Sequence, residues 1–221
     1  MKEAYYSPES IERKAQEFCQ QLEQRQRRRL ERFIPRRSAL LALDMQAYFF
    51  EPASHAFIPS APAIVPGIQA LVRLYLQHQL PVIFTRHLNT PENAASMATW
   101  WKQLILPGDP LSEIIPSLDL SRGVVVHKSQ YDAFYHTSLE DLLRSQEVSQ
   151  VVICGVMTHL CCETTARSAF MRGYEVFFTV DGTATYNAEH HWAALLNLAH
   201  GFATPALTQE IAAALEGKHA G

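Results

Sequence analysis

Three side chains that together could activate a thiol each stand close behind a short apolar stretch of the sequence. Asp44 ends the first such stretch, Lys128 follows the third, and Cys161 comes soon after the fourth. A carboxylate can take the proton of a thiol, and a cation stabilises the thiolate that results. About 117 residues separate Asp44 from Cys161, so the groups can meet only where strand ends converge. The set predicts a cysteine nucleophile at one edge of a sheet.

The position of Cys161 bears on its acidity. A thiol with a pKa of about 8.5 is roughly 3% ionised at pH 7, whereas a pKa of about 6 would ionise about 90% of it. If Thr158 caps a helix that runs to Arg172, Cys161 lies in the first turn, where the helix dipole favours an anion. We therefore expect a lowered thiol pKa, with Lys128 as a second positive charge. Asp44 is expected to accept the thiol proton and pass it to a leaving group.

The elements that must position these groups follow from the alternation of apolar runs. From Ser38 onward, strand-length runs alternate with longer segments of helical periodicity, which is typical of βαβ units. We predict an α/β fold: a three-layer α/β/α, Rossmann-like and mostly parallel six-stranded sheet with helices on both faces. The expected strands are Ala39–Asp44, Pro81–Thr85, Gly123–His127, Gln150–Gly155, Glu175–Val180 and Gly201–Thr204. The expected helices are Val65–His78, Ser138–Ser145, Leu160–Arg172, Ala188–His200 and Thr208–Glu216.

Residues 1–37 are predicted to form an N-terminal helical arm, and residues 38–221 the sheet domain. The arm is rich in Glu, Gln and Arg, and its run Arg25–Arg29 is flanked by acidic residues, so a solvated helix face is favoured over nucleic-acid binding. Phe18, Leu22 and Leu30 could form a thin docking stripe on the arm. Residues 86–122 are irregular and are expected to pass over one end of the sheet, where such excursions often carry substrate contacts.

Composition narrows the class of protein. The 221 residues carry 19 basic and 22 acidic side chains and a net charge of -3, so no strong field points to nucleic acid or a membrane surface. Four unevenly spaced cysteines argue against a disulfide framework, and no stretch has the length of a membrane span or the pattern of a signal peptide. We expect a cytoplasmic protein whose partner is a small molecule.

Three spaced motifs give the chain a specific resemblance to a known family. They are Leu40 to Gln46 with Phe49, Val126 to Lys128 followed by Tyr131, Ala133 and Phe134, and Gly155 to Ala166 with Ala169 to Gly173. In this order they resemble the isochorismatase-like hydrolase superfamily, whose cysteine hydrolases include nicotinamidases and N-carbamoylsarcosine amidohydrolases. The resemblance runs from about Ser38 to the C-terminus.

The resemblance implies an Asp-Lys-Cys triad, with Cys161 as nucleophile, Asp44 as general acid and base, and Lys128 as the group that orients Asp44 and lowers the thiol pKa. It implies a cis peptide between Val156 and Met157 and an oxyanion hole formed by the amides of Met157 and Cys161. A carbonyl substrate would form a thioester that water hydrolyses, without a cofactor. Because the family commonly forms dimers or tetramers, we expect a homo-oligomer, with the arm as a docking surface.

Departures from the branches of the family bear on the reaction. Nicotinamidases carry an Asp-x-His metal pair where this chain has His87 to Asn89, so no metal is expected. Isochorismatases carry Gly in place of Cys161, although Met157 to His159 resembles that branch. The expected reaction cleaves a C–N bond in an amide, imide or ureido/carbamoyl small molecule. The alternatives are vinyl ether hydrolysis with Asp44 as the acid, and a thiol redox sensor or binding protein that uses Cys161 and Cys162.

Further side chains are assigned by type and position. The candidates for the substrate pocket are Tyr48, Trp100, Tyr131, Phe134 and His159. Cys154 is expected to be inert core, Cys162 to pack behind the helix, and Cys19 to be incidental. The other histidines are expected to be structural or at the surface, among them His55, His87, His136, His190 and His191.

Overall fold

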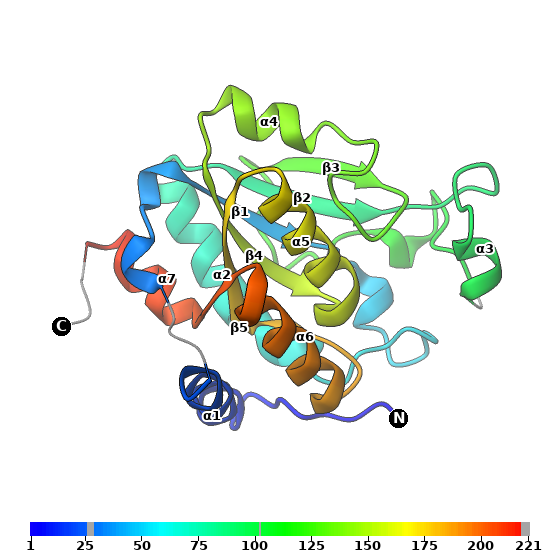
Figure 1. The fold of residues 1–221 in the computed structure, drawn as a ribbon. Helices are drawn as coiled ribbons and strands as arrows, with labels where there is room; N and C mark the ends of the chain where they lie inside the picture. The colour runs from blue at the N-terminus through cyan, green and yellow to red at the C-terminus, as the bar shows by residue number, and fades with distance from the viewer. Residues whose placement is uncertain (26–28, 102, 218–221) are drawn as a thin grey trace.

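A six-stranded, all-parallel sheet forms the centre of the molecule (Figure 1). The computed structural model describes residues 1–25, 29–101 and 103–217. The strand order is β3-β2-β1-β4-β5-β6. The strands are β1 (Ser38–Leu43), β2 (Val82–His87), β3 (Val124–Lys128), β4 (Gln150–Val156), β5 (Glu175–Ala184) and β6 (Thr204–Ala206).

Helices cover both faces of the sheet, with α5 and α6 in front of it in Figure 1 and α2 behind it. The α-helices are α1 (Ile11–Glu23), α2 (Ala61–Gln77), α3 (Met97–Trp100), α4 (Leu139–Ser145), α5 (Glu163–Met171), α6 (Ala188–Gly201) and α7 (Thr208–Leu215). Short 3-10 turns lie at Leu30–Arg32, Pro35–Arg37, Ala47–Phe49 and Pro110–Ser112, and a π-helix, η5, at Thr158–Cys162. The predicted three-layer α/β/α fold is confirmed.

Several predicted elements have different bounds in the structure; for example, α2 begins at Ala61 rather than Val65, and β5 continues to Ala184 rather than Val180. The last strand was expected at Gly201–Thr204, but α6 continues to Gly201 and the strand is Thr204–Ala206. Its central proline, Pro205, is tolerated because β6 is an edge strand. The helix expected at Leu160–Arg172 is divided into η5 and α5. Thr158 is not the cap of this helix, because its hydroxyl bonds His191 instead.

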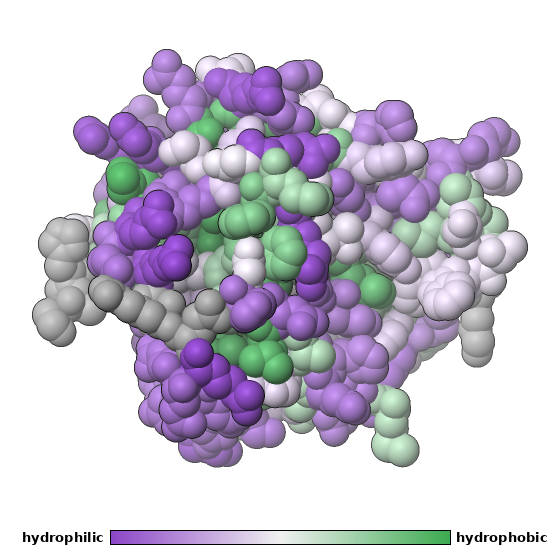
Figure 2. Space-filling model, viewed as in Figure 1, coloured by the Kyte–Doolittle hydropathy of each residue, from purple (hydrophilic) through white to green (hydrophobic). Residues whose placement is uncertain are grey.

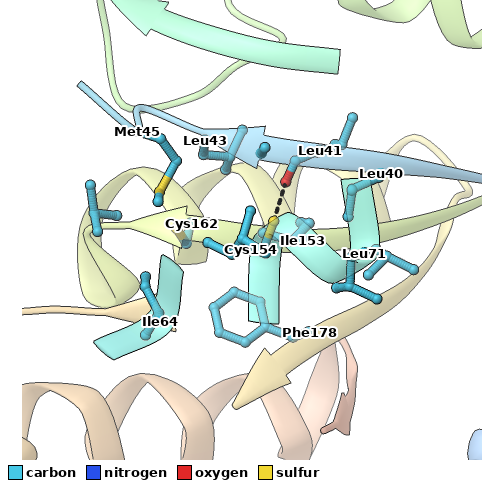
Figure 3. Close-up of a cluster of buried hydrophobic side chains, with 14 of the residues drawn as sticks. Leu40, Leu41, Leu43, Met45, Ile64, Leu71, Ile153, Cys154, Cys162 and Phe178 are labelled. Carbon is cyan, nitrogen blue, oxygen red and sulfur yellow. Dashed lines mark hydrogen bonds between the residues drawn. The ribbon is translucent and has the colours of Figure 1, made fainter. Parts of the chain in front are cut away.

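The central strands are buried on both faces, which explains why they read as continuous apolar runs. Every residue of β1 and of β4 is buried. Cys154 and Cys162 lie within an apolar cluster with leucine, isoleucine, methionine and phenylalanine side chains (Figure 3). Both thiols are 0% exposed, and the Cys154 Sγ lies 3.6 Å from the Leu41 carbonyl oxygen. The prediction that these two cysteines belong to the core is confirmed.

Gly155 stands against the backbone of β1, where there is no room for a side chain. Its φ of 115° lies in the region that favours glycine, and a Cβ there would stand 2.0 Å from the Leu43 carbonyl oxygen. The two strands pair here residue against residue, Leu43 with Gly155. The glycine therefore sets the spacing between the residue after β1 and the loop after β4.

The N-terminal segment is buried in the same core as the sheet. Tyr5, Tyr6 and Leu22 are almost fully buried, while Phe18 and Leu30 are partly buried against the core. In Figure 1, α1 and the chain before it lie below α6. The stripe of Phe18, Leu22 and Leu30 docks as predicted, but on this chain's own sheet domain. Part of the basic run, residues 26–28, lies outside the described residues, and the division of the chain at residue 37 remains a prediction.

The face shown in Figure 2 is mainly hydrophilic, with hydrophobic surface gathered over α5. Phe170 and Met171 of that helix are 48% and 73% exposed. Among the described residues, no helix has the length and hydropathy needed to cross a bilayer.

Candidate active site

The three residues singled out by type and spacing converge at the carboxyl edge of the sheet. Asp44 directly follows β1, Lys128 is the last residue of β3, and Cys161 lies in η5 after β4. Because β2 separates β3 from β1, the long side chain of Lys128 must pass the end of β2 to reach Asp44. Ligands of open parallel sheets bind at this edge.

The Lys128 ammonium lies between the carboxylate and the thiol. Its Nζ is 2.8 Å from Asp44 Oδ2 and 3.3 Å from Cys161 Sγ. It also lies 2.9 Å from the Gln130 carbonyl oxygen and 3.3 Å from Nδ1 of His87. Asp44, Lys128 and Cys161 are 0%, 3% and 5% exposed. An ammonium has three protons for these four partners, so the thiol and the imidazole share the third.

Thr85 fixes the direction of the Asp44 carboxylate. The Thr85 hydroxyl donates to Asp44 Oδ1 at 2.6 Å and accepts the Asp44 backbone N–H at 3.0 Å. Asp44 has a φ of 52°, in the left-handed region that aspartate tolerates better than most residues. The turn after β1 thus leaves one carboxylate oxygen with Thr85 and the other with the ammonium.

His87 belongs to this group, although its position had suggested a structural or surface histidine. It ends β2, which is longer than predicted, and is 7% exposed. Its Nε2 lies 2.8 Å from Asn89 Oδ1, and Gln46 accepts its backbone N–H. Lys128 can only donate, so His87 Nδ1 accepts and Nε2 carries the proton. The sequence signal for His87 was its spacing from Thr85, because side chains two residues apart in a strand lie on the same face.

The charges of the site depend on one another. Burial alone would raise the pKa of Asp44, but the ammonium of Lys128 holds it below the usual value. Burial would lower the pKa of Lys128, yet Asp44 and Cys161 raise it above the usual value. Burial and Lys128 together lower the pKa of His87 to about 4. At neutral pH the site therefore holds a carboxylate, an ammonium and a neutral imidazole.

The thiol differs from the expectation of a lowered pKa. Burial raises the pKa of Cys161 to about 12, the Asp44 carboxylate raises it as well, and Lys128 opposes both. The physical reason is that the thiol is desolvated and lies beside an anion as well as a cation. Cys161 is also the fourth residue of the π-helix rather than part of the first turn of an α-helix. The resting group is a neutral thiol hydrogen-bonded to Asp44.

A small cavity of about 40 Å³ opens beside Cys161. Its walls include Tyr48 and Tyr131 among the predicted pocket residues, together with Phe49, His55, Ala56, His87, Asn89, Trp101, Gln103, Leu104, Ile105 and Met157. The Trp101 indole N–H donates to the Tyr131 hydroxyl at 3.0 Å.

Three predicted pocket residues lie elsewhere. Trp100 is 81% exposed, and its neighbour Trp101 faces the cavity instead. Phe134 is buried beneath the Arg172 guanidinium, 4.8 Å from its ring. His159 points away from Cys161 toward Thr185, with 2.6 Å between Nδ1 and the hydroxyl. Trp101 is the extended residue that follows α3, so its side chain leaves the backbone in a different direction from that of Trp100.

The loop after β4 has the backbone conformation that the resemblance implies. The peptide between Val156 and Met157 is cis. Met157 lines the cavity, and its backbone N–H makes no hydrogen bond with another described residue. A family model described as the isochorismatase domain matches residues 38–210, which include the whole sheet and this loop.

The chain belongs to the isochorismatase family. It is 39% identical over 171 residues to Nicotinamidase 3 of Arabidopsis thaliana, covering 75% of this chain and 82% of that protein. It is 30% identical over 183 residues to Enterobactin synthase component B of Escherichia coli (strain K12), covering 81% of this chain and 64% of that protein.

Solved structures of the family resemble this isochorismatase-family chain closely. A cysteine hydrolase from Pseudomonas syringae pv. phaseolicola 1448A superposes with a TM-score of 0.80 at 29% identity, covering 85% of this chain and 96% of that one. A pyrazinamidase of Pyrococcus horikoshii in complex with zinc gives 0.71 at 26% identity, covering 77% and 99%. The family and its relatives establish that the chain is a hydrolase.

The zinc of the Pyrococcus horikoshii structure raises the question of a metal in this family member. Within the described residues, Asp44, His87 and Cys161 form the group whose possible ligand atoms all lie within 4.8 Å of one another. The Lys128 ammonium is in contact with all three side chains, so a divalent ion there would be placed against a fixed positive charge. Asn89 supplies an amide rather than a carboxylate and is bonded to His87. These residues do not fit a metal ion.

Proposed function

We propose that this hydrolase cleaves the C–N bond of a small amide, imide or ureido/carbamoyl compound through a thioester on Cys161. The observation that carries the proposal is the placement of the Lys128 ammonium 2.8 Å from the Asp44 carboxylate and 3.3 Å from the Cys161 sulfur. All three groups are buried, and Cys161 and Met157 line the cavity. This arrangement provides a nucleophile, a base that can receive its proton, and a cation that stabilises both anions.

The first half of the reaction moves one proton twice. Because the resting thiol is neutral, Asp44 takes its proton as Cys161 Sγ attacks the substrate carbonyl carbon, which leaves a tetrahedral oxyanion. The amides of Met157 and Cys161 are proposed to bind that oxyanion. The carboxylic acid of Asp44 then gives the proton to the leaving nitrogen as the C–N bond breaks. An amine or ammonia departs and the acyl group remains on sulfur as a thioester.

The second half repeats these transfers with water. Asp44, ionised again, takes a proton from water as the water oxygen attacks the thioester carbon. When the C–S bond breaks, the sulfur leaves as a thiolate next to the Lys128 ammonium and recovers its proton from Asp44. The products are a carboxylic acid or carbamate and the regenerated thiol. The low pKa of Asp44 suits this role, because a carboxylate that is ionised at rest can accept a proton at the first step.

The walls of the cavity indicate the chemical character of the substrate, although the free space is smaller than a substrate needs. Aromatic side chains of Tyr48, Trp101 and Tyr131 supply flat walls, and His87 and Asn89 supply polar atoms. Ligand pockets usually enclose at least about 300 Å³, which is much more than the free space found here. Residues 103–105, which belong to the excursion over the sheet, form one wall. Entry of a planar amide would require this wall to move outward, as lids do in many enzymes.

The decisive test is a screen of nicotinamide, N-carbamoylsarcosine and isochorismate with the wild-type protein, Cys161→Ala and Asp44→Asn. The proposal expects hydrolysis of an amide or carbamoyl compound that both substitutions abolish. Trapping of an acylated Cys161 by acid quench and mass spectrometry would identify the thioester. Amide hydrolysis that persists in Cys161→Ala would refute it.

The two alternative functions give different results in the same screen. Vinyl ether hydrolysis with Asp44 as the acid would survive Cys161→Ala and be lost in Asp44→Asn. A redox sensor would show no turnover but would lose two protons from the peptide containing Cys161 and Cys162 after mild peroxide. The apolar surroundings of Cys162, whose pKa burial raises well above the usual value, make it a poor thiolate and disfavour that outcome.

A further inference from the structure

Four polar side chains behind the Cys161 loop form a connected, buried group that the proposed reaction does not use. They are Tyr5, Tyr6, Thr158 and His191, each no more than 4% exposed. Thr158 is the first residue of η5, three positions before Cys161. His191 lies in the first turn of α6, and the tyrosines precede α1. The group therefore joins the start of the chain to the loop of the proposed nucleophile.

The proton arrangement on one side of this group is fixed by a backbone carbonyl. Tyr6 donates its hydroxyl proton to the Val180 oxygen at 3.2 Å. The Tyr6 oxygen also lies 3.2 Å from Nε2 of His191, and since its own proton is used, His191 must donate there. Burial lowers the pKa of His191 to about 3, so the ring has one proton and Nδ1 accepts. The Thr158 hydroxyl, 3.0 Å from Nδ1, is the donor.

The other side is fixed by a backbone N–H. Thr185 donates its N–H to the Tyr5 hydroxyl oxygen at 3.0 Å. The Thr185 hydroxyl lies 2.6 Å from Nδ1 of His159 in η5, so Thr185 links Tyr5 to the π-helix, and the Tyr5 ring packs 5.2 Å from that of His191. One series of bonds thus runs from Thr158 through His191 and Tyr6 to the carbonyl of Val180, and a second joins Tyr5 through Thr185 to His159.

Further contacts hold the tyrosine segment in place. The Glu3 N–H donates to the Tyr186 carbonyl at 2.8 Å, and the Glu3 carboxylate accepts the N–H of Ala188 at 2.8 Å. The Tyr6 N–H donates to the Ser60 hydroxyl at 3.0 Å. In α1, the Phe18 ring stacks on Trp192 of α6 at 5.9 Å. The segment is bound to the turn before α6 and to α6 itself.

We propose that Tyr5, through Thr185, and Tyr6, through His191 and Thr158, are positioning residues that hold η5 in the conformation that presents Cys161 to Asp44 and Lys128. The proposal rests on the proposed role of Cys161 as nucleophile. The family model begins its match at residue 38, so both tyrosines lie outside the matched region. The N-terminal segment then acts as a part of the active-site framework that lies outside the matched domain.

Single hydroxyl deletions test the proposal, with a matched control in the same protein. Tyr5→Phe and Tyr6→Phe keep the rings, which pack 4.6 Å apart, and remove only the hydrogen bonds. Tyr75→Phe is the control, because Tyr75 is also fully buried and bonds the Ser38 hydroxyl at 2.9 Å, at the opposite end of β1. We expect kcat to fall about tenfold in the first two variants with KM nearly unchanged, as for a small displacement of a reacting group. Tyr75→Phe is expected to retain kcat. Equal losses in all three variants would overturn the proposal.

A substrate-free measurement keeps this proposal separate from the function proposed above. Amide hydrogen exchange of the peptide covering Met157 to Cys162 is expected to speed up about tenfold in Tyr5→Phe and Tyr6→Phe, and to stay unchanged in Tyr75→Phe. Unchanged exchange in the first two variants would refute the positioning role, whatever the reaction is. If activity instead survives Cys161→Ala while exchange changes as expected, only the proposed function fails.

Thr158 offers a second pair of variants should a tyrosine variant not fold. Thr158→Ser retains the hydroxyl and is expected to keep kcat within about twofold, whereas Thr158→Val keeps the shape and is expected to lose about tenfold. The same kcat for serine and valine would contradict the proposal, because the hydroxyl would then have no role.

Discussion

Asp44→Asn is expected to make Cys161 more reactive toward an alkylating agent while making the enzyme less active toward its substrate. The two effects separate because Asp44 has two influences on the thiol. Its charge opposes ionisation of Cys161 and so raises the thiol pKa, whereas its basicity is needed to remove the thiol proton during attack. Asparagine suits the test because it also tolerates the left-handed backbone found at this position.

The distance between the groups sets the size of the effect. The ligand atoms of Asp44 and Cys161 lie within 4.8 Å. At an effective dielectric constant of about 20, two unit charges at that distance interact by about 3 kcal/mol, which is about 2 pKa units. The thiolate fraction at neutral pH would rise about 100-fold, and the lower nucleophilicity of a less basic thiolate would offset about tenfold of this. Alkylation should therefore speed up about tenfold. Loss of the base should slow hydrolysis by about 10² to 10⁴.

The assay is the rate of iodoacetamide modification of Cys161 at several pH values, followed by peptide mass spectrometry. Cys154, whose pKa is raised by burial alone, serves as the internal reference for general loosening. Cys161→Ala identifies the peptide signal. Slower alkylation in Asp44→Asn, or a wild-type rate that does not change with pH, would show that the resting sulfur is already a thiolate paired with Lys128, and the reasoning would be wrong.

Three further predictions follow from charge, space and burial. Lys128→Met should slow Cys161 alkylation and destabilise the protein by about 3–5 kcal/mol in denaturant unfolding, because it leaves the buried Asp44 carboxylate without its cation. Gly155→Ala should lower the free energy of unfolding by about 3 kcal/mol or more. Gly173 also has a positive φ but has open space around it, so Gly173→Ala should lower it clearly less. Equal losses in the two variants would contradict the steric argument. Because burial lowers its pKa, His191 binds fewer protons in the folded than in the unfolded protein, so its contribution to stability is lost as the pH falls from about 6.5 toward 3. In His191→Gln, the free energy of unfolding should therefore rise less steeply with pH between pH 4.5 and 6, by about 1.4 kcal/mol per pH unit.

The sequence was sufficient to predict which three side chains meet at the sheet edge. Asp44, Lys128 and Cys161 each follow an apolar run long enough for a strand, and parallel strands place their carboxyl ends on one edge. His87 was not recognised because β2 was expected to end at Thr85. Two more residues of strand place its imidazole beside Lys128. Errors of two residues at a strand end are enough to move a side chain out of a site.

Properties that depend on tertiary surroundings could not be obtained in this way. The acidity of Cys161 is set by how completely the thiol is buried and by its distance from Asp44, neither of which the local sequence encodes. Of the adjacent pair Trp100 and Trp101, only the fold decides which ring faces the cavity. The burial of Tyr5 depends on contacts with residues about 180 positions away, which no local pattern indicates.

Lys128 comes from β3, an edge strand whose ladder partner within the described part of the chain is β2. Val124 and Val125 at the start of β3 are about two-fifths exposed, whereas β1 and β4 are buried throughout. The cation of the site therefore comes from an edge strand, where local opening costs less free energy than at the centre of a sheet, while Asp44 and Cys161 follow central strands. Partial opening of that edge would move the Lys128 ammonium away from Asp44 and Cys161, and the site would lose its activity while the rest of the molecule stayed folded.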